Sequence, residues 1–140
     1  MNTNRMLTAG LVGAIAAFIL GFLTWGLALA GVMESNLGSA TGVMKDQADF
    51  MWIPMILGHL SWGFFFAYVY GQWANIKTFV TGAKAGAVLG FLIGFTYDMI
   101  GLGSTNVMNT IGTIIDVVAM TIISAIVGGV VGWMLGRGAD

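Results

Sequence analysis

Apolar residues fill four long stretches of the chain, at residues 6–32, 51–73, 79–102 and 111–135, and polar residues gather between them. A helix needs about 20 residues to cross the hydrocarbon core of a bilayer, and each stretch has about that length or more. The longest polar stretch, residues 33–50, is too short for a further domain. The pattern therefore predicts one all-α domain, an integral membrane four-helix bundle with short connections.

The composition agrees with a membrane protein. Of the 140 residues, 58% are hydrophobic and 8% are charged, and the mean hydropathy is +0.91, far outside the average of soluble domains. The net charge of -1 offers no basic surface for a nucleic acid. The chain has no cysteine, which excludes disulfides and thiolate metal sites. The expected partners are the lipid bilayer and other membrane subunits, or further copies of the chain in a homo-oligomer.

The few basic residues are divided unequally between the two ends of the predicted bundle. Because four spans place both termini on one side, Arg5, Lys77, Lys84 and Arg137 fall with the termini and Lys45 falls opposite. The positive-inside rule then predicts cytoplasmic termini and an outer loop at residues 33–50. We expect the inner membrane of a bacterium.

Several residues mark the ends of the predicted spans. Pro54 falls in the first turn of the second span, where its missing N–H costs little. Asn109 is placed to cap the fourth span. Trp52 lies near one membrane face and Trp73 and Trp133 near the other, as in the aromatic belts of membrane proteins.

A weak internal repeat relates the first span to the third. A shift of 73 residues lays Gly13, Ala14, Phe18, Gly21 and Phe22 onto Gly86, Ala87, Phe91, Gly94 and Phe95. A true repeat predicts two helical hairpins related by a pseudo-two-fold axis along the membrane normal. The alternative is that spans rich in Gly, Ala and Phe resemble one another by composition alone.

Small residues recur at every fourth position in all four spans, and in the third span they lead to Asp98. Interior glycines cost about 1 kcal/mol each relative to alanine in a helix, but in lipid they let helices approach closely. A four-residue step drifts by about 40° around a helix, so Asp98 need not share a face with Gly82. The predicted helix-packing residues are Gly13, Gly21, Gly63, Gly71, Gly82, Gly86, Gly90, Gly94, Gly128, Gly132 and Gly136.

Three ionisable residues lie within the spans at a similar distance from the outer face. They are His59, Asp98 and Asp116, and Trp25 and Tyr97 fall in the same layer. Ionisable groups inside a membrane usually face a bundle interior or a watery cavity. The three predict either a site for a proton or small cation, or a metal site of one imidazole and two carboxylates. The alternatives are a hydrogen bond that joins helices, or an aspartate that reaches water.

Methionine adds a further option for a metal. Met51, Met55 and His59 repeat at four-residue spacing on the second span. Thioether and imidazole ligands suit Cu(I). Methionine is also ordinary filling in apolar packing, so the pattern is not specific to copper.

An enzyme is not expected. The chain has no second histidine, no glycine loop after a strand and no serine in a nucleophile elbow; Ser61, Ser104 and Ser124 are isolated within or beside spans. A hydroxyl in such a position usually bonds its own or a neighbouring helix. No cofactor is predicted.

The run AAFILGFLTW at residues 16–25, followed by a polar loop and three further spans rich in small residues, resembles a bacterial family of small four-span membrane proteins of unknown function. The resemblance covers the layout of most of the chain and is specific around the first span. Family members carry Trp-Tyr-Ser-Pro where this chain has Trp25-Gly26-Leu27-Ala28. The resemblance implies four spans and no particular activity.

Two functions of different classes fit these patterns. The first is a non-enzymatic accessory subunit that packs through its glycine rows within a homo-oligomer or a larger membrane complex. The second is a small transporter or channel whose outer-half site of His59, Asp98 and Asp116 binds a proton, a metal or a small cation.

Overall fold

The computed structural model describes residues 3–43 and 47–137, and nearly all of their regular structure is helical. The one exception among the described residues is an isolated antiparallel bridge between Leu37 and Met108. In chain order the elements are α1 (Thr3–Gly21), the π-helix η1 (Phe22–Ala28), α2 (Ala30–Ser35), the 3₁₀ turn η2 (Gln47–Asp49), α3 (Trp52–Tyr68), the π-helix η3 (Val69–Ala74), α4 (Phe79–Ser104) and α5 (Thr110–Gly136).

Four helical stretches are long and apolar enough to cross a membrane. They run over Thr3–Ala28, Trp52–Ala74, Phe79–Ser104 and Thr110–Gly136. The prediction of an all-α chain with four such helices is confirmed. The first stretch ends at Ala28, short of residue 32, because Leu29 leaves helical geometry (φ −104°, ψ 0°) before the short helix α2 begins.

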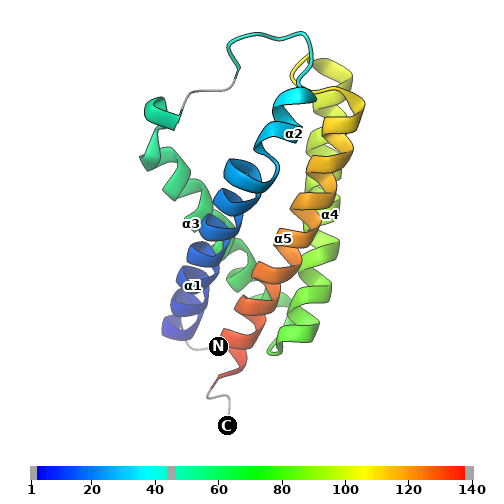
Figure 1. Cartoon of the computed structure of the whole chain (residues 1–140). Helices are drawn as coiled ribbons and strands as arrows, with labels where there is room; N and C mark the ends of the chain where they lie inside the picture. Colours follow the sequence, from blue (N-terminus) through cyan, green and yellow to red (C-terminus); the bar gives the residue numbers. More distant parts are fainter. Residues whose placement is uncertain (1–2, 44–46, 138–140) are drawn as a thin grey trace.

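The helices associate as two pairs. α1 packs against α3, α4 packs most extensively against α5, and contacts between α1 and α5 join the pairs (Figure 1). A two-fold axis between the hairpins would exchange α1 with α4 and α3 with α5. The contact between α1 and α5 would then have an equivalent between α4 and α3, yet α3 and α4 make little direct contact. The repeat therefore stays a prediction from the sequence.

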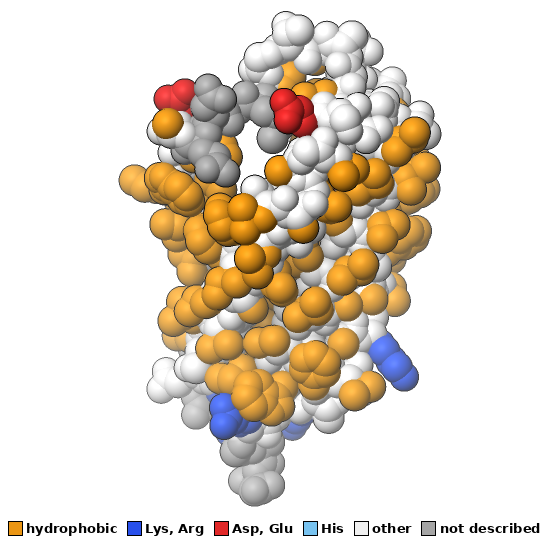
Figure 2. Space-filling view, in the orientation of Figure 1, with side chains coloured by type: hydrophobic (Ala, Val, Ile, Leu, Met, Phe, Trp, Pro, Cys, Tyr) orange, Lys and Arg blue, Asp and Glu red, His pale blue; other side chains and the backbone are white. Residues whose placement is uncertain are grey.

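The two ends of the bundle carry opposite charge. Both termini and the α3–α4 loop lie at one end (Figure 1), and Figure 2 shows Lys and Arg side chains only at that end of the visible face, with Asp and Glu at the other. We call these the basic end and the loop end. The described basic residues of the basic end are Arg5, Lys77, Lys84 and Arg137. Lys45 lies outside the described residues.

The buried core lies where α1, α3 and α5 meet, and close backbone approach makes it compact. A Cβ atom on Gly63 would meet backbone atoms of Gly10 and Ala14, and one on Gly13 would meet the side chain of Val131. The largest apolar cluster contains Ala9, Ala17, Phe66, Ala67, Tyr70, Ile123, Val127, Val131 and Leu135.

The fully buried residues of α4 are its glycine row and Asp98. They are Gly82, Gly86, Gly90, Gly94 and Asp98, all at four-residue spacing. Asp98 is thus buried together with the glycines, although the row drifts around the helix. A neighbouring helix that follows a four-residue row stays in contact with it despite the drift, and here α5 is that neighbour.

Helix ends follow local chemistry, with one feature that the sequence analysis missed. The Asn109 side chain accepts a hydrogen bond from Gly112 N at 2.9 Å, so the predicted cap of the fourth span is confirmed, and Pro54 lies in the first turn of α3. The missed feature is the pair of π-helical turns. In η1, for example, Leu29 N donates to Thr24 O, five residues back, at 2.7 Å.

Candidate carboxylate site

Two aspartates from the most tightly packed helix pair face one another. Asp98 of α4 and Asp116 of α5 lie close enough for their carboxyl groups to interact. Asp98 is only 4% exposed, and no N–H or O–H group of the described residues reaches its buried Oδ2 atom. Two neighbouring carboxyl groups that are shielded from water are not readily ionised at the same time, because their like charges repel strongly there.

A tryptophan from the other helix pair completes the arrangement. The indole Nε1–H of Trp25 donates to Asp116 Oδ1 at 2.6 Å. Trp25 lies in η1, where the i→i+5 hydrogen bonds of a π-helix change the direction in which side chains point. The bond fixes one Asp116 oxygen as an acceptor and ties the first helix to α5.

A cavity reaches the pair from the loop end. It has a volume of about 280 Å³, and its lining includes Asp98 and Thr113 together with the end of α4 and the loop that follows it. Ser104 at the end of α4 and Thr105 at the start of the loop are both exposed. A space of this size admits several water molecules, so water in the cavity can reach Asp98, which lines it.

His59 lies beside the site and does not join the two carboxyl groups. Its Nδ1 donates to the carbonyl oxygen of Met55 at 2.7 Å, and its ring meets Phe18 edge-on at 5.1 Å between centroids. Its Nε2 faces α1 at Gly21, 3.1 Å from the point where a Cβ would stand, and the Trp25 ring lies 3.8 Å from the same point. His59 is therefore a neighbour of Trp25.

The predicted metal sites find no support in this geometry. Among the described residues, no group of three or more His, Asp or Glu side chains is arranged to hold a metal ion. Of the three residues proposed to share a site, Asp98 and Asp116 come together and His59 stands apart. Met51 is 59% exposed just before α3, and Met55 engages His59 through its backbone rather than its sulfur.

Most of the predicted packing glycines lie against another helix within the chain. A Cβ on Gly82 or Gly86 would run into the backbone of α5, and one on Gly90 or Gly94 would meet the side chains of Ser124 or Met120. On the other side of the contact are Gly128, beside Tyr70 and Gly82, Gly132, beside Thr78, and Gly136, beside the Lys77 carbonyl. Gly71 lines a separate cavity at the basic end.

Searches of family models, curated proteins and solved structures with this chain return no match.

The sequence contained a signal for the aspartate pair and a weaker one for the tryptophan. A shared depth predicted that Asp98 and Asp116 belong to one layer, and Trp25 fell in that layer too. Depth says nothing about which way a side chain points around its helix. The hydrogen bond from Trp25, and the separation of His59, follow from helix rotation and from η1.

Proposed function

We propose that this chain is a small membrane transporter of a bacterial inner membrane, with cytoplasmic termini, that binds and releases a proton at the Asp98–Asp116 pair. The observation that carries the proposal is the pair itself: two facing carboxyl groups, one almost fully buried, beside a cavity at the loop end. A hydrogen bond between two carboxyl groups requires a shared proton, as in the aspartic-protease dyad. Intramembrane carboxyl groups of this kind are typical of proton-coupled transport.

A proton suits the pair better than a metal ion does. The third polar group at the site is the Trp25 indole, which is only a donor and so stabilises an anionic oxygen without ligating a cation. The histidine that would supply a third ligand is not grouped with the two carboxylates in a set of three that could hold a metal, among the described residues. Two carboxyl oxygens and an N–H donor thus make a site whose natural occupant is a proton.

The distribution of charge supports an outer opening of the cavity. The described basic residues gather at the end with the termini, which the positive-inside rule assigns to the cytoplasm. The cavity that reaches Asp98 lies at the opposite end. Protons would then reach the pair from the outer side.

Proton uptake into proteoliposomes that contain a pH-sensitive dye tests the proposal. We expect Asp98→Asn and Asp116→Asn each to slow the protein-dependent proton flux by about tenfold or more, because each removes one half of the shared-proton site. Glu34→Gln is the matched control, since Glu34 is an exposed carboxylate at the same end. A flux that survives Asp98→Asn unchanged would contradict the proposal.

Infrared difference spectra provide a readout that does not depend on the transported substrate. The difference between the spectra in acidic and in alkaline buffer should contain the band of a protonated, buried carboxyl group. We expect this band in the wild type and in Glu34→Gln. The band should be lost in both aspartate variants. Retention of the band in Asp98→Asn would mean that the proton resides elsewhere.

A second candidate, an accessory subunit that packs against another helix, is favoured by the gap between α3 and α4. A cavity of about 220 Å³ lies there, lined by Gly58, Trp62 and Gly90 among others, and the buried Nε1 of Trp62 has no hydrogen-bond partner among the described residues. A helix of another copy seated in this gap would supply apolar contact and an acceptor for Trp62. The packing glycines Gly90 and Gly128 face into the bundle, so they do not test this idea.

Gly58 is the better probe of association. A Cβ on Gly58 meets nothing within 4 Å, so Gly58→Leu should fill the gap and leave the bundle intact. Gly103→Leu is the control, because Gly103 is equally open but lies outside the gap. The accessory function predicts that Gly58→Leu alone lowers the mass of the purified particle measured by light scattering. An unchanged mass would argue against it.

A further inference from the structure

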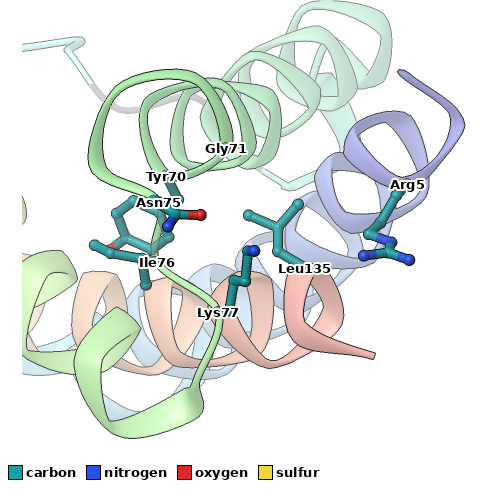
Figure 3. A pocket seen from close by; sticks show the side chains of 7 residues that line it. All are labelled: Arg5, Tyr70, Gly71, Asn75, Ile76, Lys77 and Leu135. Atoms are coloured by element: carbon teal, nitrogen blue, oxygen red, sulfur yellow. The ribbon is translucent and has the colours of Figure 1, made fainter. Parts of the chain in front are cut away.

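A second cavity lies at the basic end of the bundle, on the opposite side of the molecule from the carboxylate pair. It has a volume of about 210 Å³ and is lined by residues from three segments: the start of α1, the η3–α4 connection and the end of α5 (Figure 3). Of the described residues that line it, two are basic, Arg5 and Lys77, and none is acidic. Asn75 adds an amide.

The walls of this cavity are held by backbone contacts and an interhelical hydrogen bond. Tyr70 donates its hydroxyl proton to the carbonyl oxygen of Gly82 at 2.7 Å, which fixes its ring between η3 and α4. The carbonyl of Lys77 lies against Gly136, where a Cβ would collide with it. Asn75 turns the chain with a positive φ of 49°, a conformation that asparagine tolerates better than most residues. The cavity is thus a built site rather than a loose surface.

Its depth matches the headgroup layer of a membrane. Trp73 and Trp133 lie at the same end and are exposed, and the guanidinium of Arg137 lies 4.4 Å from the centre of the Trp133 ring. Such tryptophans mark the interface between hydrocarbon and headgroups. Basic pockets between helices on the cytoplasmic side are suited to anionic headgroups.

We infer that the cavity lined by Arg5, Asn75 and Lys77 binds the phosphate group of an anionic membrane lipid. Lys77 and Arg5 supply positive charge and hydrogen-bond donors from opposite sides of Leu135, as Figure 3 shows, and the Asn75 amide adds a neutral donor. The apolar wall, with Ile76 and Leu135, faces the region where the lipid's glycerol and acyl chains begin. This inference does not depend on the carboxylate pair or on proton binding.

Lipid retention by the purified protein tests the inference. Protein in detergent is mixed with equal amounts of phosphatidylglycerol and phosphatidylcholine, and native mass spectrometry measures the ratio of the two lipids that stay bound. We expect Lys77→Gln to lower the preference for phosphatidylglycerol by about fivefold, the effect of one basic group near an anionic headgroup. Lys77→Arg should restore the preference, which excludes misfolding as the cause of the loss.

Lys84→Gln is the matched control. Lys84 carries the same charge at the same end but lines a different, open groove beside α4. We expect it to change the preference by less than about twofold. Equal losses in Lys77→Gln and Lys84→Gln would overturn the inference, because they would indicate a diffuse surface effect. Displacement of phosphatidylglycerol by millimolar inorganic phosphate would also overturn it, since the site would then recognise free phosphate.

Discussion

At the scale of single residues, Trp25 is the link between the first helix and the carboxylate pair. Its indole N–H donates to Asp116 at 2.6 Å across 91 residues of sequence. Hydrogen bonds between helices in membranes average about 0.6 kcal/mol and reach about 1.7 kcal/mol. The larger value is expected here, because the acceptor is a carboxyl oxygen and such bonds are stronger than neutral ones.

Trp25→Phe keeps an aromatic ring and removes only the donor. We expect it to lower the free energy of unfolding in detergent by about 1–2 kcal/mol. Trp73→Phe is the control, because Trp73 is 74% exposed and its indole N–H donates no hydrogen bond to the described residues. A double-mutant cycle with Asp116→Ala, which removes the acceptor, isolates the bond: the Trp25→Phe effect should shrink by most of its size in that background. An undiminished effect would show that ring packing, not the bond, is responsible.

The residue scale also shows how far the site could be predicted from sequence. Asp98 and Asp116 were grouped by depth alone, and they do face each other. His59 was grouped with them by the same reasoning, yet its ring turns toward Phe18 and Gly21. Depth follows from counting residues along an apolar run, whereas direction depends on how each helix is rotated, which hydropathy does not encode.

At the scale of helices, the α4–α5 contact depends on the absence of side chains. The carbonyl oxygen of Ser124 occupies the place where a Cβ on Gly86 would stand, so the backbones of the two helices touch directly. Backbone cannot move aside as a flexible side chain can. Any larger residue at this position must push α4 and α5 apart.

Gly86→Ala should therefore destabilise the protein although alanine favours helix. We expect a loss of about 1–3 kcal/mol in the free energy of unfolding, as in overpacked cores, measured by denaturation in mixed detergent micelles. Gly58→Ala is the control, because a Cβ there meets nothing within 4 Å and alanine improves helix propensity. If the two variants are equally stable, the direct α4–α5 backbone contact is not the source of stability.

The positions of the four long helices could be predicted from the sequence, but the π-helical turns within them could not. The spans and the Asn109 cap follow from apolar length and local hydrogen bonding. The π-helical turns of η1 and η3 do not, because their i→i+5 bonds are favoured by surrounding packing rather than by a residue pattern. Since η1 carries Trp25, this missed feature is also why its bond to Asp116 was not anticipated.

At the scale of the whole molecule, the arrangement of helices is less symmetric than the repeat in the sequence suggests. The first and third spans share a pattern of Gly, Ala and Phe, yet α1 packs on α5 while α3 and α4 stay apart. Apolar spans can bury several of their faces, so their pattern does not determine which face meets which helix. The gap that results is lined by Trp62, whose buried Nε1 atom has no hydrogen-bond partner among the described residues.

The orientation of the whole molecule decides from which side each cavity is reached, and it can be tested directly because the chain has no cysteine. Ser39 at the loop end and Gln72 at the basic end are exposed and uncharged, so Ser39→Cys and Gln72→Cys leave the charge distribution unchanged. The four basic residues at the end of the termini predict that this end stays in the cytoplasm.

A membrane-impermeant maleimide added to intact cells should then label Ser39→Cys, and should label Gln72→Cys only after the membrane is permeabilised. The opposite pattern would place the carboxylate pair on the cytoplasmic side and would reverse the direction from which a proton reaches Asp98. Equal labelling of both variants would indicate two populations of opposite orientation. The first pattern is the expected one, because basic side chains decide orientation and favour the cytoplasmic side, whereas acidic residues such as Glu34 at the loop end contribute little.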